Sequence, residues 1–219
     1  MGKFRGKYRI ESNRLKGWDY SSNAMYFITL VTQNRECNLG EIKNSEMILS
    51  DYGKIIETEW LKSFDIRNEL LLDEYIIMPN HLHAIVIIDT TGDDDSNVTY
   101  DTHVETHGRA SLPSQSTSTV LYRLPKSISS FVGGFKSAIN SKIDDYIDEI
   151  NIKDERPFIS TKYNRNNHFF QPNYHDHIIR NHESYVRIKN YIINNPQKWA
   201  EDTFNVKTHG CASQPNDNK

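Results

Sequence analysis

The chain has 219 residues, which suits one domain with a sizeable hydrophobic core and some appended sequence. A hydrophobic content of 37% is low and indicates that part of the chain does not pack, while a formal net charge of −3 gives no overall sign of nucleic-acid binding. The charge is uneven, however: residues 3–16 carry six basic side chains against one acid, and residues 89–112 reverse this balance. A basic arm and a basic C-terminal half suit phosphate binding, although a basic arm can also be a solubilising tail.

No apolar run is long enough to span a membrane, and the first residues lack the apolar core of a secretory signal. Cys37 and Cys211 lie far apart, the second in a polar stretch, so the sequence indicates neither a disulfide framework nor a zinc knuckle. We therefore expect a cytoplasmic protein that has no membrane partner.

The predicted elements follow the order strand, helix, strand, strand, helix, strand, helix. Runs rich in β-branched and aromatic residues predict strands over residues 25–32, 70–78, 81–88 and 168–172. Apolar residues at helical spacing predict helices over residues 51–64, 127–150 and 181–195. Ser50 or Asp51 is the expected N-cap of the first helix, Pro79-Asn80 is a turn between two strands, and Pro196 ends the last helix.

This order predicts an α+β fold, a mainly antiparallel sheet with helices on one side. We expect a basic arm over residues 1–22, the domain over residues 23–200 and a disordered tail over residues 201–219. Residues 89–126 are rich in Asp, Thr, Ser and Gly and are longer than structureless loops usually are in compact domains, so we interpret them as a mobile insertion. Residues 104–113 match residues 206–215 at seven positions, which we interpret as one repetitive element in the DNA read twice.

His81 and His83 are the most informative pair in the chain. Because side chains alternate across a strand, two histidines separated by one residue point to the same face, and Leu82 falls on the other. Apolar residues beyond His83 on both faces favour a central strand, where two unpaired imidazoles would be costly. Such a pair predicts half of a divalent-metal site. The alternative is two surface histidines on a half-exposed strand.

The last predicted helix places Tyr191 and Asn195 four residues apart, so they stack on one flank of the helix. This spacing can present a phenol and an amide oxygen to one point. An amide oxygen is a suitable ligand for a hard cation and would complete the two imidazoles. The alternative is a core tyrosine and an asparagine that caps the helix before Pro196.

Four motifs in order resemble the REP-associated tyrosine transposases, which belong to the single-tyrosine HUH transposase superfamily. They are Pro79-Asn-His-Leu-His83, Phe135-Lys-Ser137, Tyr174-His-Asp-His-Ile-Ile-Arg180 and Tyr191-Ile-Ile-Asn-Asn-Pro196. The resemblance runs from about residue 25 to residue 199, which is most of the chain. The insertion over residues 89–126 and the sequence after residue 199 depart from the family pattern.

The resemblance implies a ferredoxin-like α+β fold and cleavage and joining of single-stranded DNA at short palindromic hairpin elements. It also implies a divalent ion, Mg²⁺ or Mn²⁺, on His81 and His83, with Asn195 at the third ligand position and Tyr191 as the nucleophile. Attack by the phenol would give a 5′-phosphotyrosine and a free 3′-hydroxyl. Tyr174 and Tyr185 are alternative nucleophiles. The sequence leaves open whether the protein is a monomer or a homodimer and whether Tyr191 acts within its own chain.

Basic residues in both halves are candidate phosphate contacts, the sequence-independent part of DNA affinity. The candidates are Arg5, Arg9, Lys136, Lys142, Arg165, Arg180, Arg187 and Lys189. Aromatic residues of the basic arm, among them Trp18 and Tyr20, could stack on unpaired bases or could fasten the arm to the core. His175 and His177 form a second pair around a charged residue, which we interpret as a structural or DNA-contacting segment.

Two other functions compete with the transposase. A histidine-triad nucleotide hydrolase also begins with alternating histidines, but here the next residues on the same face are Ile85 and Ile87. A domesticated module that binds hairpin DNA without catalysis is the stronger alternative.

Overall fold

The computed structural model describes residues 14–90, 126–153, 163 and 167–205, together with the backbone of residues 3–4 and 7–8. Most of the predicted insertion and both copies of the repeat lie outside the described residues. The predicted boundaries of the arm, the domain and the tail stay predictions, although residues 201–205 of the expected tail are described and lie against the domain.

A four-stranded antiparallel sheet forms the centre of the fold, with the strands in the order β6-β7-β3-β8. The strands are β3 (Ala24–Val31), β6 (Leu70–Met78), β7 (His81–Ile88) and β8 (His175–Ile179). Helix α1 (Asp51–Asp65) connects β3 to β6, and helix α2 (Ile128–Lys153) connects β7 to β8. This connectivity and strand order are those of a ferredoxin-like fold, so the predicted fold class is confirmed.

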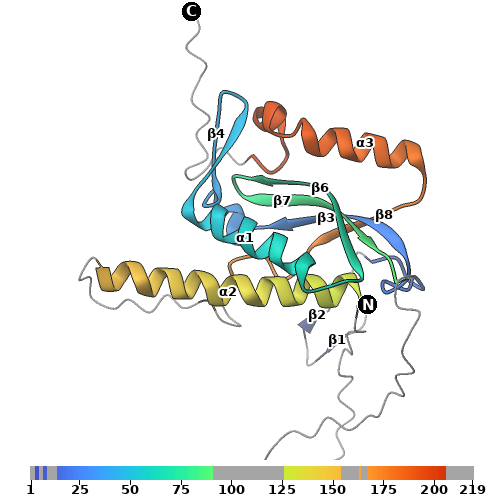
Figure 1. Ribbon diagram of the computed structural model, residues 1–219, viewed down its shortest axis with the longest axis horizontal. Helices are drawn as coiled ribbons and strands as arrows, with labels where there is room; N and C mark the ends of the chain where they lie inside the picture. Colours follow the sequence, from blue (N-terminus) through green and yellow to red (C-terminus); the bar gives the residue numbers. More distant parts are fainter. Residues whose placement is uncertain are drawn as a thin grey trace, which may run out of the picture.

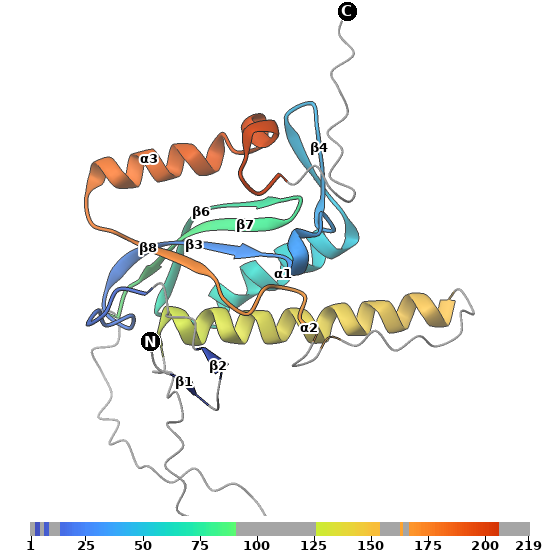
Figure 2. The same ribbon diagram turned by 180° about the vertical axis from the view of Figure 1, so that it is seen from behind.

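Helices cover both faces of the sheet. Helices α1 and α2 lie together under one face, while α3 (His182–Ile193) runs across the opposite face, as Figures 1 and 2 show from two sides. The prediction of helices on one side was therefore wrong. The reason lies in β7, where Ile85 is as fully buried as Leu82 although the two point to opposite faces. A strand that is apolar on both faces needs cover on both.

The face under α1 and α2 holds the larger core. On β7 it buries Leu82, Ala84, Val86 and Ile88 against aromatic residues such as Trp60, Phe131 and Phe135. The opposite face holds a smaller cluster beneath α3, formed by Ile85, Ile179, Ile188 and Ile192. The two clusters pack against both faces of β7 and hold it between two helical layers, so its side chains have little freedom to shift.

Local signals set the helix ends. The Ser50 hydroxyl accepts a hydrogen bond from the backbone N–H of Gly53 at 3.1 Å and caps α1. The Asn181 side chain caps α3 in the same way through the N–H of Ser184 at 2.8 Å. The helix predicted over residues 127–150 continues to Lys153 as α2.

Several elements differ from the prediction. The strand expected over residues 168–172 is an isolated bridge between Phe170 and Thr32, and the fourth strand begins at His175. A hairpin of β4 (Gly40–Lys43) and β5 (Glu46–Leu49) was not predicted. Its strands are too short to show a clear period, and the tight turn between them uses Asn44 and Ser45 with positive φ. The remaining short elements are β1 (Lys3–Phe4), β2 (Lys7–Tyr8), η1 (Gln33–Arg35) and η2 (Pro196–Glu201).

The end of the basic arm is fastened to the domain. The indole N–H of Trp18 donates to the Tyr26 hydroxyl at 3.1 Å, and the Tyr20 ring stacks on that of Tyr26 at 5.9 Å. Of the two roles considered for Trp18 and Tyr20, the structure favours attachment to the core.

Cys37 is disulfide-bonded, contrary to the expectation from the sequence, and Cys211, the other cysteine of the chain, lies outside the described residues. Among the described helices none is long and apolar enough to cross a membrane.

Candidate metal and nucleophile site

His81 and His83 lie on the α3 face of β7, at the end of the strand next to the Pro79-Asn80 turn. β7 has neighbours on both sides, since His81 is paired with Val31 on β3 and with Met78 on β6. Both imidazoles are buried, with 0% and 1% exposure, and their ring centroids are 4.4 Å apart. The alternative of two surface histidines on a half-exposed strand does not hold in this structure.

One ring nitrogen of each histidine is already engaged. Nδ1 of His81 lies 2.9 Å from Oδ1 of Asn80, and Nδ1 of His83 lies 2.8 Å from Oγ1 of Thr29. The Asn80 amide nitrogen donates to the backbone carbonyls of Arg35 and Phe204 at 3.2 and 2.7 Å. Its oxygen must therefore face His81, so Nδ1 of His81 carries the proton and Nε2 presents a lone pair. This second contact orients the ring as it does in metal-binding histidines.

The Nε2 atom of His81 is buried and has no hydrogen-bond partner among the described residues. A buried acceptor without a donor is costly, and it is explained if the site takes an ion. Burial lowers the pKa of His81 well below its usual value, and the neighbouring His83 lowers it further. Burial and the charge of His175 likewise lower the pKa of His83 to about 3. Both imidazoles are thus neutral at pH 7, the form that binds metal.

Tyr191 approaches the histidine pair from α3. Ser184, Ile188 and Ile192 form the buried stripe of that helix, and Tyr191 lies beside the stripe with 43% exposure. Its hydroxyl lies 3.2 Å from Nε2 of His83, and its ring meets Phe27 edge to face at 6.2 Å. The tyrosine and the histidine pair that were far apart in the sequence therefore meet within one chain.

Asn195 lies one turn beyond Tyr191 and is 2% exposed. Its Oδ1 atom is the second buried acceptor at the site that lacks a partner among the described residues. Burial raises the pKa of Tyr191, the Asp202 carboxylate raises it further, and a hydrogen bond from the Asn195 side chain opposes them. The phenol is consequently protonated at neutral pH.

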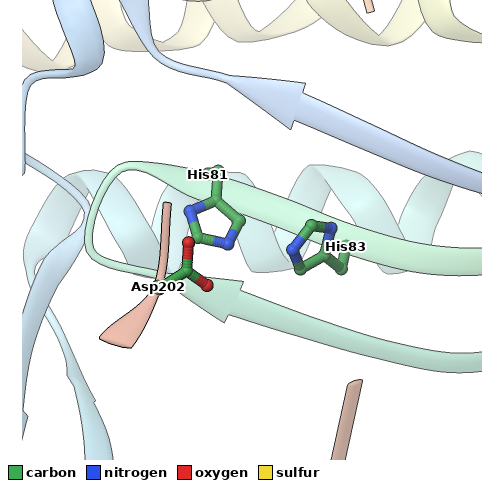
Figure 3. A group of neighbouring side chains, drawn as sticks. All are labelled: His81, His83 and Asp202. Carbon is green, nitrogen blue, oxygen red and sulfur yellow. The ribbon is translucent and has the colours of Figure 1, made fainter. Parts of the chain in front are cut away.

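Asp202 is a carboxylate at this site that the sequence did not indicate. Its ligand atoms and those of His81 and His83 all lie within 4.8 Å of one another, and Figure 3 shows the carboxylate beside the two rings. It follows the short helix η2, and its Oδ1 accepts the backbone N–H of Phe204 at 2.7 Å. The only signal in the sequence was an acid seven residues after Asn195, which is too common to interpret.

Residues 202–205 cover the histidine pair. The Phe204 ring lies 4.6 Å from that of His81, and the Arg35 guanidinium lies 5.5 Å from the Phe204 ring centre. The Arg35 side chain also donates to the carbonyl of Thr203 at 3.3 Å. This cover explains the low exposure of both imidazoles.

The alternative nucleophiles have other partners. The Tyr174 hydroxyl accepts a hydrogen bond from Arg14 at 2.6 Å, and the Tyr185 hydroxyl accepts one from Lys189 at 3.2 Å. In the second histidine pair, Asp176 between the two histidines is turned inward, with a 5% exposed side chain 3.9 Å from Arg14. This geometry fits the structural interpretation of that segment.

The candidate phosphate contacts that the structure describes each have a partner within the protein. Lys189 forms an ion pair with Asp73 at 2.8 Å, and its hydrogen bonds to Asp73 and to the Tyr185 hydroxyl raise the pKa of its ammonium group. Lys142 lies 3.7 Å from Asp145, Arg180 lies over the Trp18 ring at 5.9 Å, and Arg187 lies 3.4 Å from the Ser184 hydroxyl. Lys136 donates to backbone carbonyls. Arg5, Arg9 and Arg165 lie outside the described residues. A role of these residues in DNA binding stays a prediction.

Comparison with known proteins finds a relative by sequence and solved structures with a similar fold. No family model matches the chain. An uncharacterised protein of Haemophilus influenzae is 32% identical over 206 residues, which cover 92% of this chain and 96% of that protein.

A REP-associated tyrosine transposase bound to a REP hairpin is 17% identical, with a TM-score of 0.49, over 86% of this chain and 74% of that one. A putative transposase from Deinococcus radiodurans R1 is 14% identical, with a TM-score of 0.37, over 84% of this chain and 97% of that one.

Proposed function

We propose that this protein is a metal-dependent enzyme that nicks and joins single-stranded DNA. The chain belongs to the same family as the uncharacterised protein of Haemophilus influenzae. Its substrates would be short palindromic hairpin elements, and its intermediate a 5′-phosphotyrosine on Tyr191. One observation carries the proposal: the Tyr191 hydroxyl lies 3.2 Å from Nε2 of His83, beside the unpartnered Nε2 of His81. A phenol placed at two neutral imidazoles is an arrangement for phosphoryl chemistry rather than for packing.

The donor set fits a hard divalent ion, Mg²⁺ or Mn²⁺. His81 and His83 would supply two imidazole nitrogens, and Asn195 and Asp202 would supply oxygen atoms. The two unpartnered buried acceptors, Nε2 of His81 and Oδ1 of Asn195, are the observation behind this assignment. When bound, the ion supplies charge that polarises the scissile phosphate and neutralises the negative charge that grows on it.

Tyr191 supplies the nucleophile. Its oxygen forms a bond to phosphorus as the bond from phosphorus to the 3′ oxygen breaks. The 3′ oxygen takes up a proton from water, which leaves a 5′-phosphotyrosine and a free 3′-hydroxyl. The exchange of one ester for another keeps the bond energy for rejoining with a new 3′-hydroxyl. Because the pKa of Tyr191 is raised, the phenol must lose its proton during attack, and its 43% exposure lets water take it.

Phe27 and His83 hold the Tyr191 ring from two sides, so its hydroxyl has a defined position before DNA binds. The tyrosine and the histidines belong to the same chain in this arrangement. We therefore propose that attack occurs within one chain and that a monomer is sufficient. The DNA partner would approach the exposed side of Tyr191.

A second candidate function is a hairpin-DNA-binding module that has lost catalysis. The cover formed by residues 202–205 favours it, since the Phe204 ring lies against His81 where a phosphate would have to approach. For the enzyme to act, the Phe204 ring must move away from His81.

A single experiment separates the two functions. Labelled single-stranded DNA with a hairpin is incubated with the full chain and Mg²⁺ or Mn²⁺, and covalent protein–DNA adducts are resolved on a denaturing gel. The enzyme forms an adduct that disappears in Tyr191→Phe and persists in the matched control Tyr185→Phe. Tight binding without an adduct in either ion would replace the enzyme with the binding module.

A further inference from the structure

The edge strand β6 contains a bulge on the side of the sheet that α3 covers. Its pairing with β7 is regular up to Leu72 and resumes at Tyr75, but over this stretch β6 uses one residue more than β7. Asp73 and Glu74 therefore lie together opposite Ile85, which faces α3. In a regular strand two neighbouring residues point to opposite faces. The bulge brings both acids to the α3 face.

Both acids meet one lysine of α3, the helix that lies over β6 in Figures 1 and 2. The Lys189 ammonium donates to Oδ1 of Asp73 at 2.8 Å and lies 3.8 Å from Oε2 of Glu74. All three side chains are partly buried, with 20 to 32% exposure. Oδ2 of Asp73 is buried and has no hydrogen-bond partner among the described residues, so this carboxylate depends on the lysine for its compensating charge. A further hydrogen bond from the ammonium, to the Tyr185 hydroxyl, stays within α3 and does not link the helix to the sheet.

Lys189 and Tyr191 lie on opposite flanks of the buried stripe of α3. Around the helix axis, Lys189 lies about 100° to one side of Ile188 and Tyr191 lies about 60° to the other side. Ile188 and Ile192 pack on the sheet in a cluster of four buried residues. Apolar packing is not directional, so a cluster of this size holds the helix on the sheet more firmly than it fixes the rotation of the helix about its axis. The ion pair on one flank resists that rotation and therefore helps to place the tyrosine on the other flank.

A small rotation of α3 is enough to disturb the site. Side chains reach about 5–6 Å from a helix axis, so a rotation of about 10° displaces their ends by about 1 Å. The Tyr191 hydroxyl lies 3.2 Å from Nε2 of His83, and a displacement of this size breaks the contact. A reacting atom misplaced by about 1 Å can slow a reaction by about 100-fold.

We propose that Lys189, held by Asp73 and Glu74 of the β6 bulge, is a positioning residue that sets the rotation of α3 and so places the Tyr191 hydroxyl at His83. The inference rests on the proposed function and deepens it, because it says what orients the nucleophile. It also differs from the prediction that Lys189 contacts phosphate. A phosphate contact contributes to DNA affinity and to the salt dependence of that affinity, whereas a positioning residue contributes to the rate at saturating DNA.

The first measurement is the single-turnover rate of adduct formation by the full chain, with Mn²⁺ and saturating labelled hairpin DNA. Lys189→Met keeps the apolar stem and removes the charge, and Asp73→Asn breaks the same ion pair from the other side, should Lys189→Met not fold. Each should slow adduct formation by roughly 10- to 100-fold and leave the DNA dissociation constant within about 2-fold. Lys189→Arg, which keeps the charge, should stay within about 5-fold of the wild-type rate. The matched control is Lys62→Met, which should keep the wild-type rate because the ion pair of Lys62 with Glu59 at 3.6 Å stays within α1.

The second measurement does not depend on catalysis. Nuclear magnetic resonance of ring-labelled tyrosine follows the Tyr191 signal, which is assigned by its loss in Tyr191→Phe. The Phe27 and His83 rings lie 6.2 and 5.2 Å from the Tyr191 ring, so a displaced Tyr191 ring changes its chemical shift. The signal should move in the two variants that break the ion pair and should stay in place in Lys189→Arg and in the control.

An unmoved Tyr191 signal in both variants that break the ion pair would overturn the proposal, whether or not DNA is cleaved. A signal that moves while the rate at saturating DNA is unchanged would overturn the role in orienting the nucleophile. Weaker DNA binding with a smaller salt dependence, at an unchanged saturated rate, would make Lys189 a phosphate contact instead. If the wild type forms no adduct, the proposed function fails, and the chemical shifts alone decide whether Lys189 positions Tyr191.

Discussion

The two faces of the sheet use the same strand for different purposes. On the face under α1 and α2, β7 contributes Leu82, Ala84 and Val86 to a continuous apolar core. On the face under α3, the same strand contributes Ile85 to a small cluster, and the neutral imidazoles of His81 and His83 lie at the beginning of the strand. Because side chains alternate along a strand, three consecutive residues, His81, Leu82 and His83, serve the apolar core on one face and the candidate metal site on the other.

The separation also explains why the imidazoles can stay unprotonated and partly unpartnered. Burying a polar group without a partner lowers the free energy of unfolding, and the large core on the opposite face offsets this loss. The α3 face is the thinner one, with a cluster of four buried apolar residues and an exposed tyrosine beside it.

The largest effect should come from the core face. Leu82→Ala removes a fully buried side chain between the histidines, and we expect it to lower the free energy of unfolding by about 2–5 kcal/mol. The matched control is Leu71→Ala on β6, where the leucine is 50% exposed and the change should stay within about 0.5 kcal/mol. Urea unfolding followed by circular dichroism measures both. Similar values for the two variants would contradict the division of the faces.

The next effect concerns the site face. His81→Gln keeps a polar side chain of similar size but removes the unpartnered Nε2 lone pair, so we expect the affinity for Mn²⁺ to fall by more than about 100-fold. The fold should persist, with the same far-ultraviolet spectrum as the wild type. His177→Gln, an exposed histidine on β8, serves as the control and should bind Mn²⁺ as the wild type does. Titration followed by electron paramagnetic resonance reports free Mn²⁺ directly.

A smaller effect should appear in the dependence of stability on pH in the metal-free protein. Burial holds the pKa of His83 at about 3, against about 6.5 in the unfolded chain, so the unfolded state binds more protons between these values. Stability is therefore fully present above pH 6.5 and declines as the pH falls toward 3. From pH 7.5 to pH 5, His83 alone should lower the free energy of unfolding by about 2 kcal/mol.

The His83→Gln variant isolates this contribution, because it should make the decline between pH 7.5 and pH 5 shallower, while His81, whose pKa burial also lowers, keeps its own share. The His177→Gln control should decline as the wild type does. Urea unfolding at each pH, in the presence of a chelator, provides the measurement. A decline in His83→Gln as steep as that of the wild type would show that other groups carry it.

Much of the architecture could be predicted from the sequence because its signals are local. The two strands around Pro79-Asn80, the helix that begins after Ser50 and the helix before Pro196 follow from period and capping, and all four elements are found. The last helix ends at Ile193, two residues before the predicted end, and Pro196 begins η2. The hairpin of β4 and β5 was missed because two four-residue strands cannot show a period. The second helical layer was missed because apolar residues on both faces of β7 say that cover exists, not which helix supplies it.

The site could be predicted only in part, for a similar reason. Spacing placed His81 and His83 on one face and Tyr191 and Asn195 on one flank of a helix, and the family motifs linked the two groups. Nothing local indicated that Asp202 would turn back over the histidines, since this depends on η2 and on the contacts of Phe204 with His81 and Arg35. Contacts between elements far apart in the chain carry no periodic signal.

The smallest effect should distinguish this unforeseen carboxylate from the predicted ligands. Asp202→Asn keeps the acceptor for the Phe204 N–H but removes the charge, so we expect the affinity for Mn²⁺ to fall by about 10-fold, less than for His81→Gln. In the metal-free protein the same change should lower the pKa of Tyr191, because Asp202 contributes to raising it. Glu201→Gln removes a neighbouring exposed carboxylate and should change neither quantity. Nuclear magnetic resonance of labelled tyrosine measures the pKa, and Mn²⁺ titration measures the affinity. If Asp202→Asn lowers the pKa of Tyr191 but leaves Mn²⁺ binding unchanged, the carboxylate acts on the nucleophile and not on the ion, and the ligand set returns to the two histidines and Asn195.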